Sequence, residues 1–337
     1  MKAVAVAAGK RLETVEVEPP PLGPDEVRVD VAYAGICGSD LHMLQRDGTA
    51  VGHVMGHEFS GSIAEVGSPT AQWSVGDRVT VLPIDRCGHC ASCEEGIGVC
   101  RAGLSKGPGL GRMGAYAEST VVPVSMLRRL PDSVDFKAAA LAEPLAVAVR
   151  GVRRSGASPD TPVCVLGAGP IGYMTVVALL AGGFTDIVVV EPNDARREKV
   201  SDLGVPAVPA DAAADDVPAG LGGRPPALVI DCSGHRSGVP LAVTLLPQNG
   251  TLVVVGIALE PTTAPFALIS GKELTVKGSL AYSDSDFEIA LKYLAAQRVP
   301  TSKIVTAIRP LAEASAVFDD LTSGTSHHVK VLLSPRA

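Results

Sequence analysis

A short glycine-rich turn between an apolar strand and an apolar helix most restricts how this chain can fold. The strand is predicted at Val163–Leu166, and the turn reads Gly167-Ala-Gly169-Pro-Ile-Gly172. A second apolar strand, Ile187–Val190, ends at Glu191, 19 residues beyond Gly172. A lone G-x-G-x-x-G is weak evidence, but its place between a strand and a helix, with an acid after the next strand, is specific. This order predicts a βαβ unit with parallel strands.

Each glycine of this turn has a role if the unit binds a dinucleotide. Gly167 would permit the tight turn, Gly169 would let the backbone approach the pyrophosphate, and Gly172 would let the helix pack on the strand. Pro170 and Ile171 lie at the start of the helix, whose N-terminus would face the phosphates. The alternative interpretation is a glycine-rich turn of an α/β protein that binds no nucleotide.

The acid after the second strand indicates which dinucleotide would bind. Glu191 would accept hydrogen bonds from the adenosine ribose hydroxyls and would repel a 2′-phosphate, so we predict NAD rather than NADP. Arg196 and Arg197 follow closely and could soften that preference. Arg196 is our candidate for a cofactor contact, and the alternative for both arginines is a solvated helix face.

A first group of metal-binding residue types lies near the N-terminus. It consists of Cys37-Gly-Ser-Asp-Leu-His42, followed by Gly56-His57-Glu58. Cys, His and Glu are all zinc ligands, and three protein ligands with one open position define a catalytic zinc site. Taken separately, a cysteine after an apolar strand is usually core, and a His-Glu pair usually lies on the surface.

A second group is a loop with the spacing Cys87-x2-Cys90-x2-Cys93-x6-Cys100. Four thiolates satisfy tetrahedral zinc without an open position, which marks a structural site. A nucleic-acid zinc module is disfavoured by the formal net charge of -7. An iron–sulfur cluster is disfavoured because the loop is short and lacks a Cys-Pro end. We therefore predict two zinc sites, one catalytic and one structural.

Composition restricts the setting and the partners of the chain. It has seven cysteines among 337 residues, and its first residues lack the long apolar segment and cleavage site of a signal peptide. We therefore expect a cytoplasmic, reducing location without disulfides. The acidic balance predicts no nucleic-acid partner and no anionic membrane surface. Arginine in excess of lysine, with abundant Ala, Gly and Pro, favours a bacterial source.

Two uncharged stretches, Thr161–Thr185 and Ser237–Leu259, are long enough to span a membrane. Glycine and proline break both of them, so we expect a buried α/β core instead. Cys164 and Cys232 lie in or beside apolar strands and are expected in this core.

The pattern of predicted elements divides the chain into a β-rich first part and an alternating second part. Short strands in the first part are expected at Val4–Val6, Val15–Val17, Val27–Val31 and Arg78–Val81. Helical periodicity appears around Lys137–Arg154. Further strands of a parallel sheet are expected at Leu228–Asp231 and Leu252–Val255. A capping box at Ser285–Glu288 would open a helix in the C-terminal part.

Together these motifs resemble those of the zinc-dependent medium-chain dehydrogenase/reductase (alcohol dehydrogenase) family. The set of Cys37, Gly56-His57-Glu58, the four-Cys loop and the glycine turn is specific in this order, and the likeness covers nearly the whole chain. It implies an α/β fold with a GroES-like β-rich catalytic domain over residues 1–144. A Rossmann domain with a doubly wound parallel sheet would follow over 145–280, and residues 281–337 would return to complete the catalytic domain. Family members are dimers or tetramers, so we expect a homo-oligomer.

The segment Ala142-Glu143-Pro144-Leu145-Ala146 is similar to the branch that contains sorbitol, butanediol, threonine and aminocyclitol dehydrogenases. The resemblance implies that Cys37 and His57 bind the catalytic zinc. Glu58 and Glu143 would then act as ligands or hold water, and the sequence does not divide these roles. The alternative for Glu143 is a carboxylate that interacts with a helix N-terminus.

The implied reaction is the reversible oxidation of a secondary alcohol (a polyol, diol, amino alcohol or cyclitol), with hydride transfer to NAD. Zinc would polarise the hydroxyl as a Lewis acid. Ser39 and His42 lie where family members place a proton relay; the alternatives are a turn residue and an exposed helix residue. Asp40 would orient a ligand histidine.

Two other hypotheses are a zinc-free quinone or enone reductase of the same superfamily, and a non-enzymatic nucleotide-binding protein that keeps zinc for stability. The family usually has seven residues between the third and fourth loop cysteines, whereas this chain has six. We predict that the loop still binds zinc, because all four thiols remain.

Overall fold

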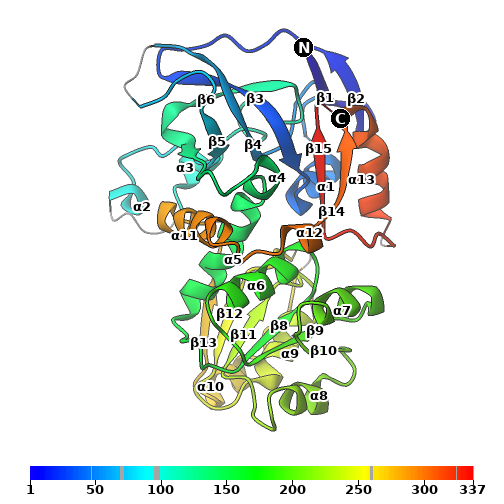
Figure 1. The fold of residues 1–337 in the computed structure, drawn as a ribbon. Helices are drawn as coiled ribbons and strands as arrows, with labels where there is room; N and C mark the ends of the chain where they lie inside the picture. The colour runs from blue at the N-terminus through cyan, green and yellow to red at the C-terminus, as the bar shows by residue number, and fades with distance from the viewer. Residues whose placement is uncertain (47, 69–71, 95–98, 259–260, 324, 337) are drawn as a thin grey trace. The chain divides into compact units, whose positions relative to one another are not determined.

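The computed structural model describes residues 1–46, 48–68, 72–94, 99–258, 261–323 and 325–336. The chain forms two compact units, each of which makes most of its contacts within itself (Figure 1). The first unit comprises Met1–Pro144 and Ser283–Ala337, and the second comprises Leu145–Tyr282. Both termini therefore belong to the first unit.

The first unit is built mainly from strands. Its strands are β1 (Lys2–Ala7), β2 (Arg11–Glu16), β3 (Glu26–Gly35), β4 (Glu58–Val66), β5 (Arg78–Val81), β6 (Ser119–Pro123), β7 (Leu127–Arg129), β14 (Val305–Pro310) and β15 (Lys330–Ser334). Its helices are α1 (Gly38–Gln45), α2 (Ala91–Glu94), α3 (Arg101–Leu104), η1 (Val124–Met126), α4 (Phe136–Ala139), α11 (Asp284–Ala295), α12 (Thr301–Ile304), η2 (Leu311–Glu313) and α13 (Ala314–Thr322).

A seven-stranded sheet forms the centre of this unit, in the order β14-β15-β3-β4-β5-β7, with β6 also paired to β3. Val27, Val29 and Val31 alternate along β3 and are fully buried, as expected for a strand with one face against the core. β15 pairs antiparallel with β3 through Leu332 and Gly35. The C-terminal segment is thus part of the sheet that carries β3.

The second unit alternates helices and strands. It contains most of α5 (Ala142–Ser155), then β8 (Val163–Leu166), α6 (Pro170–Ala181), β9 (Ile187–Val190), α7 (Asp194–Ser201), β10 (Ala207–Val208), α8 (Ala213–Gly220), β11 (Leu228–Asp231), α9 (Gly238–Leu245), β12 (Thr251–Val254), α10 (Phe266–Gly271) and β13 (Thr275–Gly278). All pairings in the six-stranded sheet β10-β9-β8-β11-β12-β13 are parallel. Helices lie against its faces (Figure 1).

This strand order is that of a doubly wound Rossmann sheet, and it places a topological switch point between β8 and β11. The predicted α/β fold class is confirmed. Of the strands predicted in this unit, β8, β9 and β11 match to the residue, and β12 is displaced by one.

One local prediction is wrong. The capping box at Ser285–Glu288 is replaced by one at Ser283, whose hydroxyl accepts from the Asp286 N–H while the Asp286 carboxylate accepts from the Ser283 N–H. The helical periodicity around Lys137–Arg154 corresponds to two helices, α4 and α5. Pro144 explains the break, because proline has no N–H to continue an earlier helix but fits a first turn.

Neither uncharged stretch forms a membrane span. Thr161–Thr185 divides into β8 and α6, and Ser237–Leu259 contains α9 and β12. Within the part of the chain that the structure describes, helices long and apolar enough to cross a bilayer are absent.

Candidate metal centres and nucleotide site

Pairing of β3 with β4 brings the first group of candidate ligands together. Gly35 at the end of β3 lies opposite Glu58 at the start of β4. Cys37, two residues beyond Gly35, therefore comes beside His57 and Glu58. One ligand atom from each of these three residues lies within 4.8 Å of the others. Such separations suit a zinc ion with bonds of about 2.0–2.3 Å.

A buried carboxylate faces the histidine of this cluster. The Asp40 Oδ1 atom lies 3.4 Å from His57 Nδ1, and neither side chain is exposed by more than 8%. Burial alone would lower the pKa of His57, but the Asp40 carboxylate raises it well above its usual value. Burial raises the pKa of Asp40, but the His57 ring, the Tyr116 hydroxyl and the Cys37 N–H together lower it, so the net shift is downward. Because Nδ1 faces Asp40, Nε2 is left for a metal.

The carboxylate of Glu58 forms a buried ion pair with a lysine that sequence reasoning missed. Lys330 Nζ lies 2.9 Å from Glu58 Oε1 and 2.7 Å from Oε2, and it also donates to the Ile36 carbonyl. Burial would lower the pKa of Lys330, but Glu58, Cys37 and Glu143 raise it. Each carboxylate oxygen keeps a lone pair for a metal. A lysine within the apolar strand β15 was the available signal.

The other candidates lie on two helices. Ser39 is exposed and His42 is half-buried, both on α1, which begins directly after Cys37. Glu143 is buried in the first turn of α5. Its carboxylate influences Lys330, but among the described residues the cluster within 4.8 Å consists of Cys37, His57 and Glu58.

The four loop cysteines form a second cluster. Their sulfurs all lie within 4.8 Å of one another, with Cys87–Cys93 at 3.9 Å and Cys90–Cys93 at 3.5 Å. A tetrahedron of sulfurs around zinc has edges of roughly 3.8 Å. The pKa of Cys93 is raised by desolvation, but the Gly88 N–H and the other thiols lower it to about 6. Cys100 is fully buried and accepts from the Gly103 N–H.

The glycine turn has the geometry that a nucleotide-binding turn requires. Gly167 has a φ of +89°, and a Cβ on Gly172 would lie 1.9 Å from the Gly167 carbonyl oxygen. Gly169 is the N-cap of α6, and a Cβ there would meet open space. Pro170 is the first residue of α6, followed by Ile171. The open space at Gly169 fits a phosphate at the helix N-terminus.

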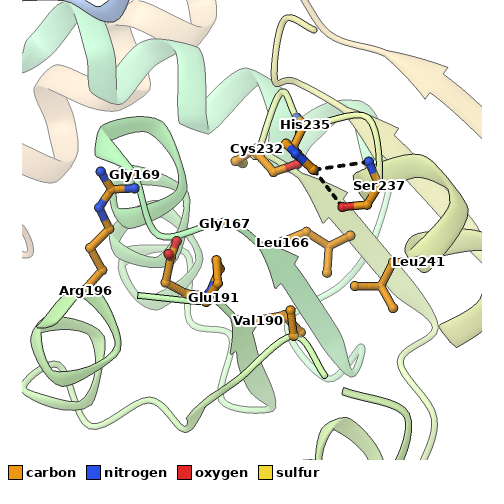
Figure 2. Close-up of a pocket in the computed structure, with 14 residues that line it drawn as sticks. Leu166, Gly167, Gly169, Val190, Glu191, Arg196, Cys232, His235, Ser237 and Leu241 are labelled. Atoms are coloured by element: carbon orange, nitrogen blue, oxygen red, sulfur yellow. Dashed lines mark hydrogen bonds between the residues drawn. The ribbon is translucent and has the colours of Figure 1, made fainter. Parts of the chain in front are cut away.

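A cavity of about 420 Å³ opens beside this turn (Figure 2). It lies at the carboxyl ends of β8, β9 and β11, where open α/β sheets bind ligands. Figure 2 shows Glu191 and Arg196 on one side and His235 and Ser237 on the other. The lining residues are Leu166, Gly167, Gly169, Val190, Glu191, Pro192, Arg196, Ala210, Cys232, Ser233, His235, Ser237, Gly238 and Leu241.

The acid after β9 is fixed by the backbone. Glu191 is buried, and its carboxylate accepts from the Ala168 N–H at 2.7 Å and the Asn193 N–H at 2.9 Å. Arg196 lines the cavity. Arg197 instead donates to the carbonyls of Glu191 and Pro192.

Sequence reasoning missed the side of the cavity that follows β11. His235 and Ser237, joined by a hydrogen bond of 2.8 Å, lie there. Cys232, expected in the core with Cys164, is half-buried and lines the cavity. Position just beyond the carboxyl end of β11 was the available signal, because loops on both sides of a switch point contact the ligand.

Two family sequence models match the chain. The sequence model of the alcohol dehydrogenase GroES-like domain matches residues 23–132, and that of the zinc-binding dehydrogenase matches residues 170–296. The 2-dehydro-3-deoxy-L-galactonate 5-dehydrogenase of Pseudoalteromonas atlantica is 33% identical over 93% of this chain and 92% of its own length.

Two solved structures resemble the whole chain, each with a TM-score of 0.89, 29% identity and 99% coverage of both chains. One is the alcohol dehydrogenase rspB of Escherichia coli CFT073 complexed with NADH. The other, from Sinorhizobium meliloti 1021, is described as a zinc-binding dehydrogenase and is bound to NADP. The chain therefore belongs to the family of zinc-binding, GroES-like alcohol dehydrogenases, which are oxidoreductases that act on alcohol groups.

Proposed function

We propose that this alcohol oxidoreductase converts a secondary alcohol of a polyhydroxylated substrate to a ketone, reversibly, with NAD as the hydride acceptor. The cluster of Cys37, His57 and Glu58 carries the proposal, because three ligands of these types leave one position open. A polyol, diol, amino alcohol or cyclitol fits this reaction. The galactonate relative, named for a sugar acid, supports a substrate with several hydroxyl groups.

The chain's own residues divide the work as follows. Cys37 and His57 would hold the catalytic zinc, with Glu58 or Glu143 as a further ligand or as a holder of water. Zinc bound there would supply Lewis-acid polarisation of the substrate hydroxyl. Ser39 and His42 would pass the hydroxyl proton toward solvent, since a hydroxyl and an imidazole can each accept and donate a proton.

Support for NAD comes from the position of Glu191. Its fixed carboxylate lies in the wall of the cavity next to the glycine turn, where it would accept from ribose hydroxyls and repel a 2′-phosphate. Arg196 is the nearby cation that would reduce this repulsion. Gly167, Gly169 and Gly172, with Pro170 and Ile171, would form the pyrophosphate side of the site.

The purified protein should reduce NAD in the presence of a panel of polyols, diols, amino alcohols and cyclitols, measured as NADH absorbance. Removal of metal with a chelator should abolish turnover, and added zinc should restore it. With NADP the value of kcat/KM should fall roughly 10-fold or more, the loss expected when an unfavourable charge contact replaces a charged hydrogen bond.

Two other outcomes would each support one of the alternative hypotheses. Turnover of quinones or enones that survives metal removal would support the zinc-free reductase. NAD binding without turnover of any alcohol would support the non-enzymatic hypothesis and would contradict our proposal.

The expected homo-oligomer has a candidate interface in the second unit. β13 is an outer strand of the six-stranded sheet, and apolar side chains lie exposed on or near it: Val276 at 47%, Phe266 at 75% and Leu280 at 39%. An exposed apolar edge strand is a template for pairing with another chain. We propose that two copies pair along β13.

The free thiols of both clusters fit a reducing compartment, for which we propose the cytoplasm.

Val276→Lys should convert the oligomer to a smaller species in light scattering, because a charge would be buried at the paired edge. Val51→Lys is the matched control, since Val51 is 71% exposed in the first unit. A monomeric wild type, or an unchanged mass for Val276→Lys, would rule out this interface.

A further inference from the structure

We propose that the hydroxyl of Tyr116 is a positioning group for the metal ligand His57 and acts through Asp40. The inference rests on the proposed function of this cluster and assigns a role to a residue between β5 and β6 that no motif marks. Tyr116 is fully buried. It lies 76 residues from Asp40 in the sequence, yet its hydroxyl oxygen is 2.6 Å from Asp40 Oδ2.

The two oxygens of Asp40 have different partners. Oδ2 accepts from the Tyr116 hydroxyl at 2.6 Å and from the Cys37 N–H at 3.0 Å. Oδ1 faces His57 Nδ1 at 3.4 Å. Two donors on one oxygen fix the rotation of the carboxylate about its Cβ–Cγ bond. The other oxygen is thereby held toward the imidazole.

Orientation matters because a ligand histidine needs its second nitrogen held. A carboxylate behind a metal-binding imidazole fixes the ring and the tautomer, so that the far nitrogen points at the metal. Without the Tyr116 hydroxyl, Oδ2 would keep the Cys37 N–H alone, and the carboxylate could rotate away from His57. Asp40 connects the Tyr116 hydroxyl to His57, so the proposed effect of the hydroxyl on the ring is indirect.

The tyrosine ring is held in place by Met55 and Gly56, the two residues before the metal ligand His57. The Tyr116 N–H donates to the Met55 carbonyl at 3.0 Å. Gly56, which precedes His57, has a φ of +99°, and a Cβ there would come within 2.6 Å of the Tyr116 ring. The ring therefore occupies the space that a side chain at position 56 would fill. This packing fixes the hydroxyl relative to His57.

The C-terminal segment also packs against the Tyr116 ring. Phe318 of α13 contacts Tyr116 edge to face, with ring centroids 6.1 Å apart. A tyrosine needed only for packing would be served equally well by phenylalanine. The hydroxyl makes a buried hydrogen bond to a carboxylate, which indicates a role in orientation.

Tyr116→Phe keeps the ring and removes only this hydroxyl, so it is the direct test. Zinc affinity at the first cluster is measured by competition with a chromophoric chelator, and the cobalt-substituted protein is measured by visible absorption. We expect about 10-fold weaker metal affinity and altered cobalt bands. Thr120→Val is the matched control, because it removes a buried hydroxyl bonded to the Met113 carbonyl in the same unit.

The indirect route predicts non-additivity. Asp40→Asn should weaken metal binding by itself, and adding Tyr116→Phe to it should cause little further loss, because both changes interrupt one chain of contacts. Wild-type affinity and cobalt bands in Tyr116→Phe would overturn the inference, as would full additivity with Asp40→Asn. These readouts do not depend on turnover, so a wild type that binds metal here but oxidises no alcohol would contradict the proposed function alone.

Discussion

Replacing Cys37 with serine should lower the zinc content from about two ions per chain to about one and should reduce kcat/KM by at least about 1000-fold. Cys37 contributes the only sulfur among the three side chains that converge within 4.8 Å. A serine hydroxyl is a poor zinc ligand at neutral pH, because it keeps its proton. Without the ion, the substrate hydroxyl would lose its Lewis acid. Metal analysis and NADH absorbance measure the two effects.

The pattern of unaffected properties makes this prediction specific. Nicotinamide cofactor binding, followed by fluorescence, should persist in Cys37→Ser, because the glycine turn and the cavity belong to the second unit. Cys164→Ala is the control for a buried cysteine that belongs to neither cluster, and it should keep both zinc ions. Full activity in Cys37→Ser would remove this cysteine from the catalytic centre.

Local sequence was sufficient where one short segment determines the structure. β8 and β9 are continuous apolar runs, and β11 is an apolar run that ends at Asp231, so their ends could be predicted to the residue. Gly167 and Gly172 belong to the same turn, and their spacing determines the close approach. The four cysteines of the loop lie within 14 positions of the chain, which makes their convergence a local property.

Contacts between distant segments could not be predicted in this way. Lys330 and Glu58 are separated by 272 residues, and only the insertion of β15 beside β3 brings them together. The hydrogen bond between Tyr116 and Asp40 likewise depends on how the segment before β6 packs against Met55, which lies just before the ligand His57. In a single sequence, Lys330 is only an isolated lysine in an apolar strand and Tyr116 is only an isolated aromatic residue, so neither shows its distant partner.

The N-cap of α11 was predicted at the wrong serine because this choice, too, depends on contacts that the sequence does not show. Ser283 and Ser285 are both possible N-caps, and the choice between them depends on which acid returns to the backbone N–H. Asp286 does so for Ser283. The helix then begins at Asp284, whose carboxylate Oδ1 also accepts a hydrogen bond from Arg86 Nε at 2.7 Å. This ion pair connects α11 with the segment that leads into the four-Cys loop, a connection between residues that are 198 positions apart.

Cys100→Ala should remove the second zinc ion and lower the free energy of unfolding by about 5 kcal/mol or more, because metal binding by such a lobe contributes directly to folding. For a chain of this size the melting temperature should fall by at least roughly 7 °C. Cys100 is the most buried of the four cysteines, and its sulfur lies next to the N–H groups of Cys87 and Gly103. Calorimetry and metal analysis measure both effects.

The loop with six residues between Cys93 and Cys100 makes this experiment decisive. If the shorter loop strains the site, the wild type itself would carry about one zinc ion, and Cys100→Ala would cost only the few kcal/mol of a small core cavity, as in Cys164→Ala. The sulfur separations of 3.5 and 3.9 Å instead match a zinc tetrahedron. We therefore expect Cys100→Ala to be much less stable than Cys164→Ala, and equal stabilities would show that the lobe holds no metal.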